Sequence, residues 1–241
     1  MSAGHGPAPL TFVLVHGAWH GGWCWARVRD ILTGRGHRVF TPTLTGLAER
    51  AHLMGTGITL DTHIADVANL IRFEGLADVV LCGHSSSGWV ISGVAEQVED
   101  QIGALVYLDG YVPEDGESGG DAFSPEDKAA FAEALNAGKP SWPPPDARHF
   151  GVNEADLDWV NGLLTPHPVG VALTPIALTG ARERIAKKAY IRAPAYPSAR
   201  FDADVAKLQN RPGWRCYQVP CGHDVMVDMP DRLAEILEEV A

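Results

Sequence analysis

The sequence predicts an α/β fold, in which helices cover both faces of a mostly parallel, doubly wound sheet of about six strands. Two observations predict it. Short apolar runs of strand length alternate with amphipathic helical patterns along the chain. One of these runs ends in Gly-His-Ser, directly before a segment that can form a helix. With 241 residues, of which 46% are hydrophobic, the chain can bury one sizeable core.

Six apolar runs are expected to form the strands. A strand that a parallel sheet buries on both faces is apolar throughout and does not alternate between apolar and polar residues. In chain order the runs are Thr11–His16, Arg38–Thr41, Asp78–Cys82, Ala104–Leu108, Ala189–Ile191 and Arg215–Val219.

Between the runs, apolar residues recur at the spacing of one helix face. The pattern is clear from Leu60 to Ile71 and again from Leu233 to Val240. A third apolar stretch, Val90–Ala95, suits a buried helix that begins just after the Gly-His-Ser sequence. This alternation of strands and helices favours a doubly wound sheet.

One long segment breaks the alternation. Residues 113–186 are rich in Pro and Gly and show no strand pattern, and short amphipathic pieces occur at Pro125–Leu135 and Ala155–Leu163. Such a stretch is too long for an ordinary loop. We therefore predict a cap (lid) of residues 113–186, inserted into a core domain formed by residues 1–112 and 187–241.

Composition excludes several classes of function. The formal net charge of −11 disfavours binding to nucleic acid or to an anionic membrane. None of the four cysteines forms a CxxC pair or has metal-ligand spacing. Residues 1–9 lack the features of a secretory signal, and no apolar stretch approaches the roughly 20 residues that span a bilayer. We therefore expect a cytoplasmic protein.

The sequence Gly83-His84-Ser85 predicts a nucleophile elbow, a tight turn between a strand and a helix that exposes a serine hydroxyl above the sheet. The usual pattern is Gly-x-Ser-x-Gly, whereas here the second glycine comes one place late, at Gly88. Ser86 and Ser87 are rival nucleophiles. Ser85 is favoured because Gly-His precedes it at the required spacing.

A nucleophilic serine needs a histidine base and an acid that orients the base. His223 follows the last expected strand, as the usual chain order of serine, acid and histidine requires. The commonest place for the acid is the loop after the fifth strand, and this loop carries no carboxylate. We therefore predict Asp109, at the end of the fourth strand, as the acid, with Asp202 and Asp204 as alternatives.

An oxyanion hole needs two N–H donors. We predict the N–H of Ser86, which follows the nucleophile, and the N–H of Ala18, in the turn after the first strand. Gly17 lets the backbone approach the substrate closely. We interpret His16 as a structural hydrogen-bonding residue.

With these motifs in place, the chain resembles the α/β-hydrolase superfamily. The opening Phe12-Val13-Leu14-Val15-His16-Gly17-Ala18-Trp19-His20-Gly21-Gly22-Trp23 is similar to that of the plant methylesterase and hydroxynitrile lyase family and its bacterial esterase relatives. Further similar motifs are Gly36-His37-Arg38-Val39, Leu44-Thr45-Gly46 and Tyr107-Leu108-Asp109-Gly110-Tyr111-Val112-Pro113. The resemblance covers residues 10–113 and 187–241.

The resemblance implies an α/β-hydrolase fold and hydrolysis of a small carboxylic ester through an acyl-enzyme, without a metal or organic cofactor. The substrate is then a small molecule, and neither nucleic acid nor a membrane is a partner. We expect Gly17, Trp19 and the cap residues Trp142, Phe150 and Trp159 to contact the substrate. The sequence leaves the oligomeric state open, with a homodimer as one option.

Three other functions are compatible with this fold. Similar lyases carry threonine at the position of Gly17 and lysine at the position of Asp224, so an aspartate there disfavours cyanide release. A small-molecule receptor that has lost turnover is a second alternative, which an intact Ser-His pair disfavours. A cofactor-free oxygenase is a third, and no residue points to it.

Overall fold

The computed structural model describes residues 8–241. Residues 1–7, on which the expectation about a secretory signal mainly rests, lie outside the described part. The six expected strands are all present, as β1 (Thr11–Val15), β2 (Arg38–Phe40), β3 (Val79–His84), β4 (Ile102–Leu108), β7 (Lys187–Arg192) and β8 (Trp214–Gln218). They form one sheet in the order β2-β1-β3-β4-β7-β8, and every neighbouring pair is parallel. The predicted doubly wound parallel sheet is therefore confirmed.

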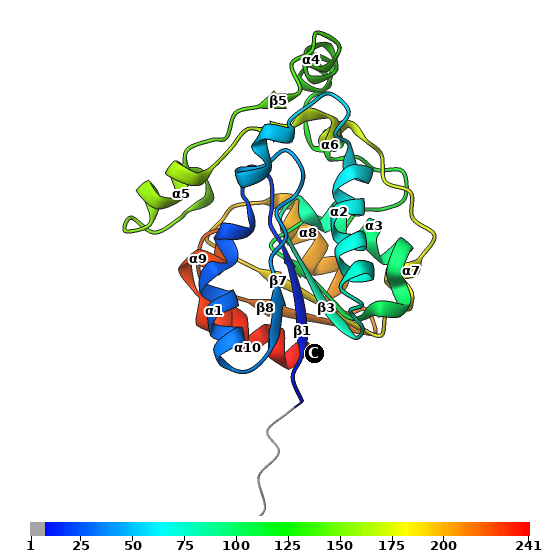
Figure 1. Cartoon of the computed structure of the whole chain (residues 1–241), viewed down its shortest axis with the longest axis vertical. Helices are drawn as coiled ribbons and strands as arrows, with labels where there is room; N and C mark the ends of the chain where they lie inside the picture. The colour runs from blue at the N-terminus through cyan, green and yellow to red at the C-terminus, as the bar shows by residue number, and fades with distance from the viewer. Residues whose placement is uncertain (1–7) are drawn as a thin grey trace, which may run out of the picture.

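Helices cover both faces of this sheet (Figure 1). They are α1 (Ala26–Gly34), α2 (Leu60–Phe73), α3 (Ser87–Val98), α7 (Ala181–Arg184), α8 (Ala199–Leu208), α9 (Val225–Asp228) and α10 (Pro230–Val240). Single 3-10 turns lie at Gly22–Trp25, Ala48–Leu53, Glu99–Gln101, Gly119–Ala122 and Ala147–Phe150. The helices expected near residues 60–71, 90–95 and 233–240 correspond to α2, α3 and α10.

Side chains of β1 alternate between two hydrophobic clusters, as the period of a strand requires. Phe12 and Leu14 pack in the cluster that contains residues of α1, α9 and α10. Val13 and Val15 pack in the cluster that contains residues of α2, α3 and α8. All four side chains are fully buried, so the sheet lies between two cores.

The cap lies above that edge (Figure 1) and contains α4 (Pro125–Asn136), α5 (Leu157–Leu163) and α6 (Val169–Leu173). It also contains two short antiparallel strands, β5 (Ser141–Trp142) and β6 (His167–Pro168). The expectation of a cap without strands is therefore wrong. Each of these strands has only two residues, which is too short to produce an alternating pattern in the sequence.

The end of the predicted cap segment packs against the core. Ala181 and Ile185 are buried in the same hydrophobic cluster as Val90 and Val94 of α3. The division at residues 112/113 and 186/187 remains a prediction.

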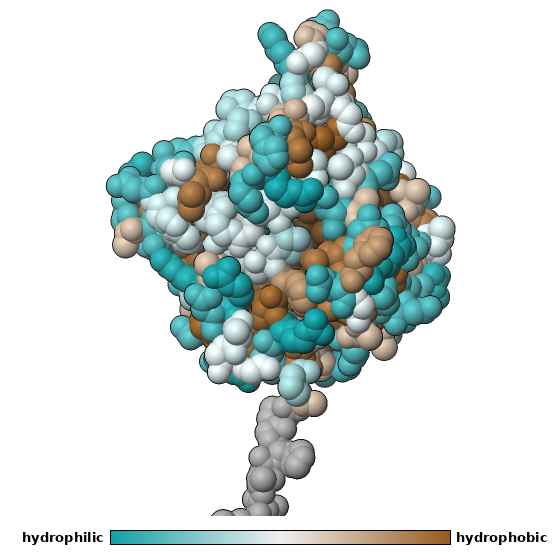
Figure 2. All heavy atoms as spheres, viewed as in Figure 1, coloured by the Kyte–Doolittle hydropathy of each residue, from teal (hydrophilic) through white to brown (hydrophobic). Residues whose placement is uncertain are grey.

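Hydrophobic residues on the face shown in Figure 2 lie in separate patches among hydrophilic ones. The large exposed hydrophobic side chains are Leu53, Phe73, Phe123 and Leu163, of which Phe73 is 89% exposed. Among residues 8–241, no helix combines the length and apolar character needed to cross a membrane.

Candidate active site

Ser85 occupies a strained turn between β3 and α3. Its φ is +55°, a left-handed conformation that is costly for a residue with a side chain and is typical of functional sites. Neighbouring glycines make room for it: a Cβ added at Gly17 would lie 2.9 Å from the Ser85 Cβ, and one at Gly110 would lie 2.6 Å from the Ser85 carbonyl oxygen. The turn therefore has the geometry of the predicted nucleophile elbow.

The late glycine of this elbow has a structural cause. A Cβ at Gly88 would overlap the carbonyl oxygen of Tyr111. The close approach of two backbone segments therefore falls at this position. Ser87 is buried, and its hydroxyl donates a hydrogen bond to the carbonyl of His16. The serine thus connects the start of α3 to the end of β1, and its side chain faces away from the reactive position.

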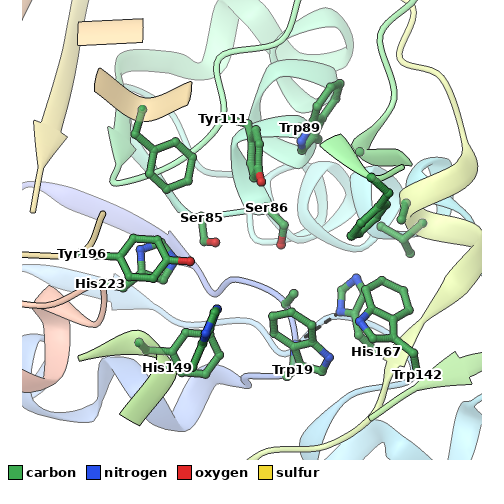
Figure 3. A pocket seen from close by; sticks show the side chains of 17 residues that line it. Trp19, Ser85, Ser86, Trp89, Tyr111, Trp142, His149, His167, Tyr196 and His223 are labelled. Atoms are coloured by element: carbon green, nitrogen blue, oxygen red, sulfur yellow. Dashed lines mark hydrogen bonds between the residues drawn. The ribbon is translucent and has the colours of Figure 1, made fainter. Parts of the chain in front are cut away.

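Asp109 and His223, the residues predicted as acid and base, form a hydrogen bond with each other. The ring Nδ1–H of His223 donates to Asp109 Oδ2 over 2.6 Å, and the Asp109 side chain is fully buried. Asp109 also has a positive φ, of +39°, in the turn after β4. Ser85 and His223 line the same pocket (Figure 3), although no hydrogen bond joins the Ser85 hydroxyl to this ring among residues 8–241. Such bonds often tighten only when substrate binds.

The alternative acids lie elsewhere, on α8. The Asp202 side chain is 65% exposed and pairs with Arg192. Asp204 pairs with Arg200 of the same helix. Neither carboxylate hydrogen-bonds to His223 within the described residues, so the geometry favours Asp109.

Arg192 was not predicted from the sequence. Its guanidinium donates to Asp109 Oδ1 over 2.7 Å, and the Ala193 N–H donates to the same oxygen over 3.0 Å. Both oxygens of the Asp109 carboxylate therefore accept hydrogen bonds, and these bonds fix the orientation of Oδ2 toward His223. Arg192 is the last residue of β7, next to the loop in which the acid is more commonly found. In the sequence, only carboxylates in that region were candidates for the acid, so this arginine was not identified.

Two backbone N–H groups open onto the pocket at the predicted oxyanion positions. Ala18 and Ser86 both line it, and among residues 8–241 no protein group accepts a hydrogen bond from either N–H. The Ser86 N–H lies at the N-terminus of α3, where the helix dipole favours negative charge.

His16 holds the peptide that carries the Ala18 N–H. Its Nδ1–H donates to the Gly17 carbonyl oxygen over 2.8 Å, and its Nε2 accepts from the Leu44 N–H over 3.0 Å. Burial lowers the pKa of His16 to about 3, so the ring is neutral. In a trans peptide the carbonyl and the N–H point in opposite directions, so this bond directs the Ala18 N–H away from His16. This agrees with the interpretation of His16 as structural.

The pocket is a cavity of about 160 Å³ with a largely aromatic wall (Figure 3). Aromatic rings from the core and the cap contribute, namely Trp19, Trp89, Tyr111, Phe123, Trp142, Phe150, Tyr196 and Phe201, with the imidazoles of His149, His167 and His223. Tyr196 stacks on His223 with ring centroids 4.3 Å apart. Trp19, Trp142 and Phe150, three of the predicted substrate contacts, line this pocket.

Two predicted substrate contacts do not line this pocket. Trp159 packs edge-on against Trp23 and lies under the guanidinium of Arg27, because the start of α5 faces α1 and not the sheet edge. Gly17 is not a wall residue either. Its missing side chain makes space for Ser85, as described above.

Asp224 faces the interior. It is fully buried, and its Oδ2 accepts a hydrogen bond from His20 Nε2 over 3.0 Å. The sequence argument that its charge would repel cyanide in the pocket therefore needs correction, since Asp224 does not line the pocket. The difference from similar lyases remains, because they carry a lysine at the position of Asp224.

Buried histidines surround the site and are mostly neutral. Burial, as the largest cause, lowers the pKa of His63 to about 4 and lowers the pKa of His84 and of His167 well below the usual value. His84 Nε2–H donates to the His223 carbonyl, and His167 Nδ1 accepts from the Trp19 N–H. Within the described chain, no cluster of three or more potential ligand side chains is arranged to hold a metal ion.

Comparison with known proteins agrees with this fold. A family model described as "Alpha/beta hydrolase family" matches residues 12–236. The chain belongs to the alpha/beta hydrolase family. An extracellular alpha/beta-hydrolase from a Paenibacillus species has the same fold, with a TM-score of 0.81 and 24% identity, over 97% of this chain and 99% of that one.

Two sequence relatives place this alpha/beta hydrolase among esterases. A carbendazim hydrolyzing esterase from Nocardioides sp. (strain SG-4G) is 44% identical over 236 residues, which are 94% of this chain and 98% of that protein. Methylesterase 2 of Arabidopsis thaliana is 33% identical over 114 residues, which are 43% of this chain and 40% of that protein. The predicted resemblance is confirmed, and the chain is an esterase-type alpha/beta hydrolase.

Proposed function

We propose that this alpha/beta hydrolase is a serine esterase, in which Ser85, His223 and Asp109 form the catalytic triad. The main observation in support is the chain of contacts from Arg192 through Asp109 to His223 in the pocket that also holds Ser85. The free N–H groups of Ala18 and Ser86 in the same pocket support an oxyanion hole.

In the proposed reaction, the Ser85 hydroxyl attacks the ester carbonyl while His223 takes its proton. Negative charge develops on the carbonyl oxygen, which accepts hydrogen bonds from Ala18 and Ser86. His223 then protonates the leaving alcohol, and an acyl group remains on Ser85. Water attacks this acyl-enzyme with His223 again as base, which releases the acid and restores Ser85.

We propose that the substrate is a small ester with a flat aromatic group. The pocket is small, about 160 Å³, and its walls are mostly aromatic rings, which favour stacking against a planar group. The name of the Nocardioides relative, a carbendazim hydrolyzing esterase, makes carbendazim the first compound to test.

A fluorophosphonate probe together with an ester panel tests the proposal. The wild-type protein should hydrolyse aromatic methyl esters or carbendazim and should be labelled on Ser85. Ser85→Ala should lose both properties, whereas Ser86→Ala should still be labelled because it keeps the backbone N–H. Absence of labelling in a folded wild-type protein would favour a receptor. Cyanide release from mandelonitrile without any ester cleavage would favour a lyase.

A further inference from the structure

His20 lies two residues after Ala18 and meets an oxygen atom at each ring nitrogen. Its Nδ1 lies 2.8 Å from the Ala18 carbonyl oxygen, and its Nε2 lies 3.0 Å from Asp224 Oδ2. The side chain is 1% exposed, and the ring stacks on Trp23 and contacts Phe150 edge-on. Its position is therefore fixed on all sides.

Both oxygens can only accept hydrogen bonds. One belongs to a backbone carbonyl, and the other to a carboxylate whose pKa is lowered to about 2. Burial raises this pKa, and the charge and hydrogen bond of His20 are the main causes that lower it. A neutral imidazole carries a single N–H, so one contact would bring two lone pairs together. An imidazolium donates to both.

The electrostatic surroundings agree with a charged His20. Burial lowers its pKa, but the Asp224 charge and hydrogen bond and the Ala18 carbonyl more than compensate, so the pKa is raised. The other titratable groups facing this pair are His16, His84, Cys24 and His223. Burial keeps His16 and His84 neutral and raises the pKa of the Cys24 thiol, so none of these three competes for the charge.

We infer that His20 and Asp224 form a buried imidazolium–carboxylate pair that positions the Ala18 oxyanion donor relative to the catalytic His223. Asp224 directly follows His223 in the chain, and His20 fixes the carbonyl of Ala18 itself. The pair thus joins the turn after β1 to the loop after β8, two segments that are 204 residues apart. This role rests on the proposed esterase function, whereas the charge state of His20 does not.

The inferred pair also accounts for the left-handed backbone of the next residue. Trp19 has a φ of +65°, which is unfavourable for a tryptophan. The peptide that precedes it is held at both of its polar groups, since the Ala18 carbonyl accepts from His20 and the Trp19 N–H donates to His167. A preorganised donor needs such supporting contacts, because a shift of about 1 Å in a catalytic group is costly.

NMR of ¹⁵N-histidine-labelled protein tests the charge state without reference to activity. At about pH 7, the wild-type protein should show one buried imidazolium with protons on both ring nitrogens, and this signal should be absent from His20→Gln. In Asp224→Asn, His20 should become neutral at the same pH, since the compensating charge is gone. A neutral His20 in the wild-type protein at about pH 7 would overturn the inference, whether or not the protein is an esterase.

Kinetics test the positioning role. Asp224→Asn should lower kcat about 10- to 100-fold with little change in KM, a smaller loss than the roughly 10²- to 10³-fold that removing an oxyanion donor costs. The alkaline limb of its kcat profile should also move to lower pH, because His20 loses its proton earlier. Asp228→Asn is the matched control, since Asp228 lies in the same segment and its side chain hydrogen-bonds only to Asn153 among the described residues. An unchanged kcat and pH profile in folded Asp224→Asn would contradict the role.

Discussion

At the scale of single residues, Asp109 is the residue on which the proposed triad most depends. Its two carboxylate oxygens have different hydrogen-bond partners. Oδ2 accepts from His223, and Oδ1 accepts from Arg192 and from the Ala193 N–H. A carboxylate held in this way can orient the imidazole and stabilise it when it takes the Ser85 proton. Asp202, the alternative acid, has an exposed side chain and accepts a hydrogen bond from Arg192 Nε.

Asp109→Asn and Asp202→Asn form a matched pair of variants. The first should reduce kcat on the order of 10⁴-fold, as expected when a triad histidine loses its orienting charge. The second should keep kcat within a few-fold, because it removes only an exposed contact to Arg192. Steady-state kinetics on one activated ester measure both. A severe loss in Asp202→Asn with near-normal Asp109→Asn would move the acid to α8.

Arg192 gives a stability prediction. Its side chain is 3% exposed, and it pairs with a fully buried carboxylate. Arg192→Met should destabilise the protein by about 3–5 kcal/mol, because it leaves the Asp109 charge buried with one partner fewer. Urea unfolding measures the change. A loss below about 1 kcal/mol would show that Arg192 is dispensable for holding the carboxylate.

At the scale of elements, the elbow between β3 and α3 depends on close backbone packing. Gly83 and Gly88 both lie where a side chain would collide, Gly83 with the Ser87 carbonyl oxygen and Gly88 with the Tyr111 carbonyl oxygen. These contacts place α3 directly against the turn after β4, which carries Asp109. The turn that carries Ser85 and the turn that carries Asp109 are thus positioned by one packed unit.

Gly88→Ala and Gly34→Ala should have opposite effects on stability. The first should cost about 3 kcal/mol or more, since the new methyl group overlaps backbone atoms that cannot move away. The second should add about 0.5–1 kcal/mol, because Gly34 is an exposed helical residue whose added Cβ would meet no atom within 4 Å. Thermal unfolding of both variants checks this. A neutral Gly88→Ala would contradict the tight elbow.

The sequence predicted the elements best where apolar residues pack in one of the two cores. All six strands of the main sheet and helices α2, α3 and α10 were expected, including the edge strands β2 and β8, which are only partly buried. Strands β5 and β6 were missed because a two-residue bridge has no period. Trp159 was expected in the pocket but packs elsewhere. A tryptophan in the sequence indicates burial, whereas the orientation of α5 determines which residues it contacts.

At the scale of the whole molecule, the site depends on contacts between distant segments that no local pattern encodes. The His20–Asp224 contact and the Arg192–Asp109 contact each join residues more than 80 positions apart. Local features allowed Ser85, His223 and Asp109 to be predicted: Ser85 follows Gly83-His84, His223 follows the last strand in the usual chain order, and Asp109 ends the fourth strand. Their supporting partners follow only from the three-dimensional packing.

Acid should destabilise the molecule through its neutral buried histidines. His16, His63, His84 and His167 have lowered pKa values in the folded protein, so below about pH 6.5 the unfolded chain binds protons that the folded chain does not. Each of these histidines should lower the free energy of unfolding by about 1.4 kcal/mol per pH unit as the pH falls. His20 and Asp224 oppose this, since the raised pKa of His20 adds stability below about pH 6.5, and the lowered pKa of Asp224 keeps its contribution down to about pH 4.

Urea unfolding between about pH 7.5 and about pH 5 measures this dependence. The free energy of unfolding should fall steeply over that interval, and His63→Gln should reduce the slope by about one proton. A free energy of unfolding that does not change between these pH values would mean that the buried histidines are protonated in the folded protein.

The most direct test of the central claim is to trap the acyl-enzyme. The protein is mixed with p-nitrophenyl acetate, quenched in acid within the first turnover and digested, and the peptides are analysed by mass spectrometry. One acetyl group is expected on Ser85 in the wild-type protein, and more of it in Asp109→Asn if deacylation slows more than acylation. Ester turnover without any acetyl group on Ser85, or with the acetyl group on another residue, would contradict the proposed role of Ser85.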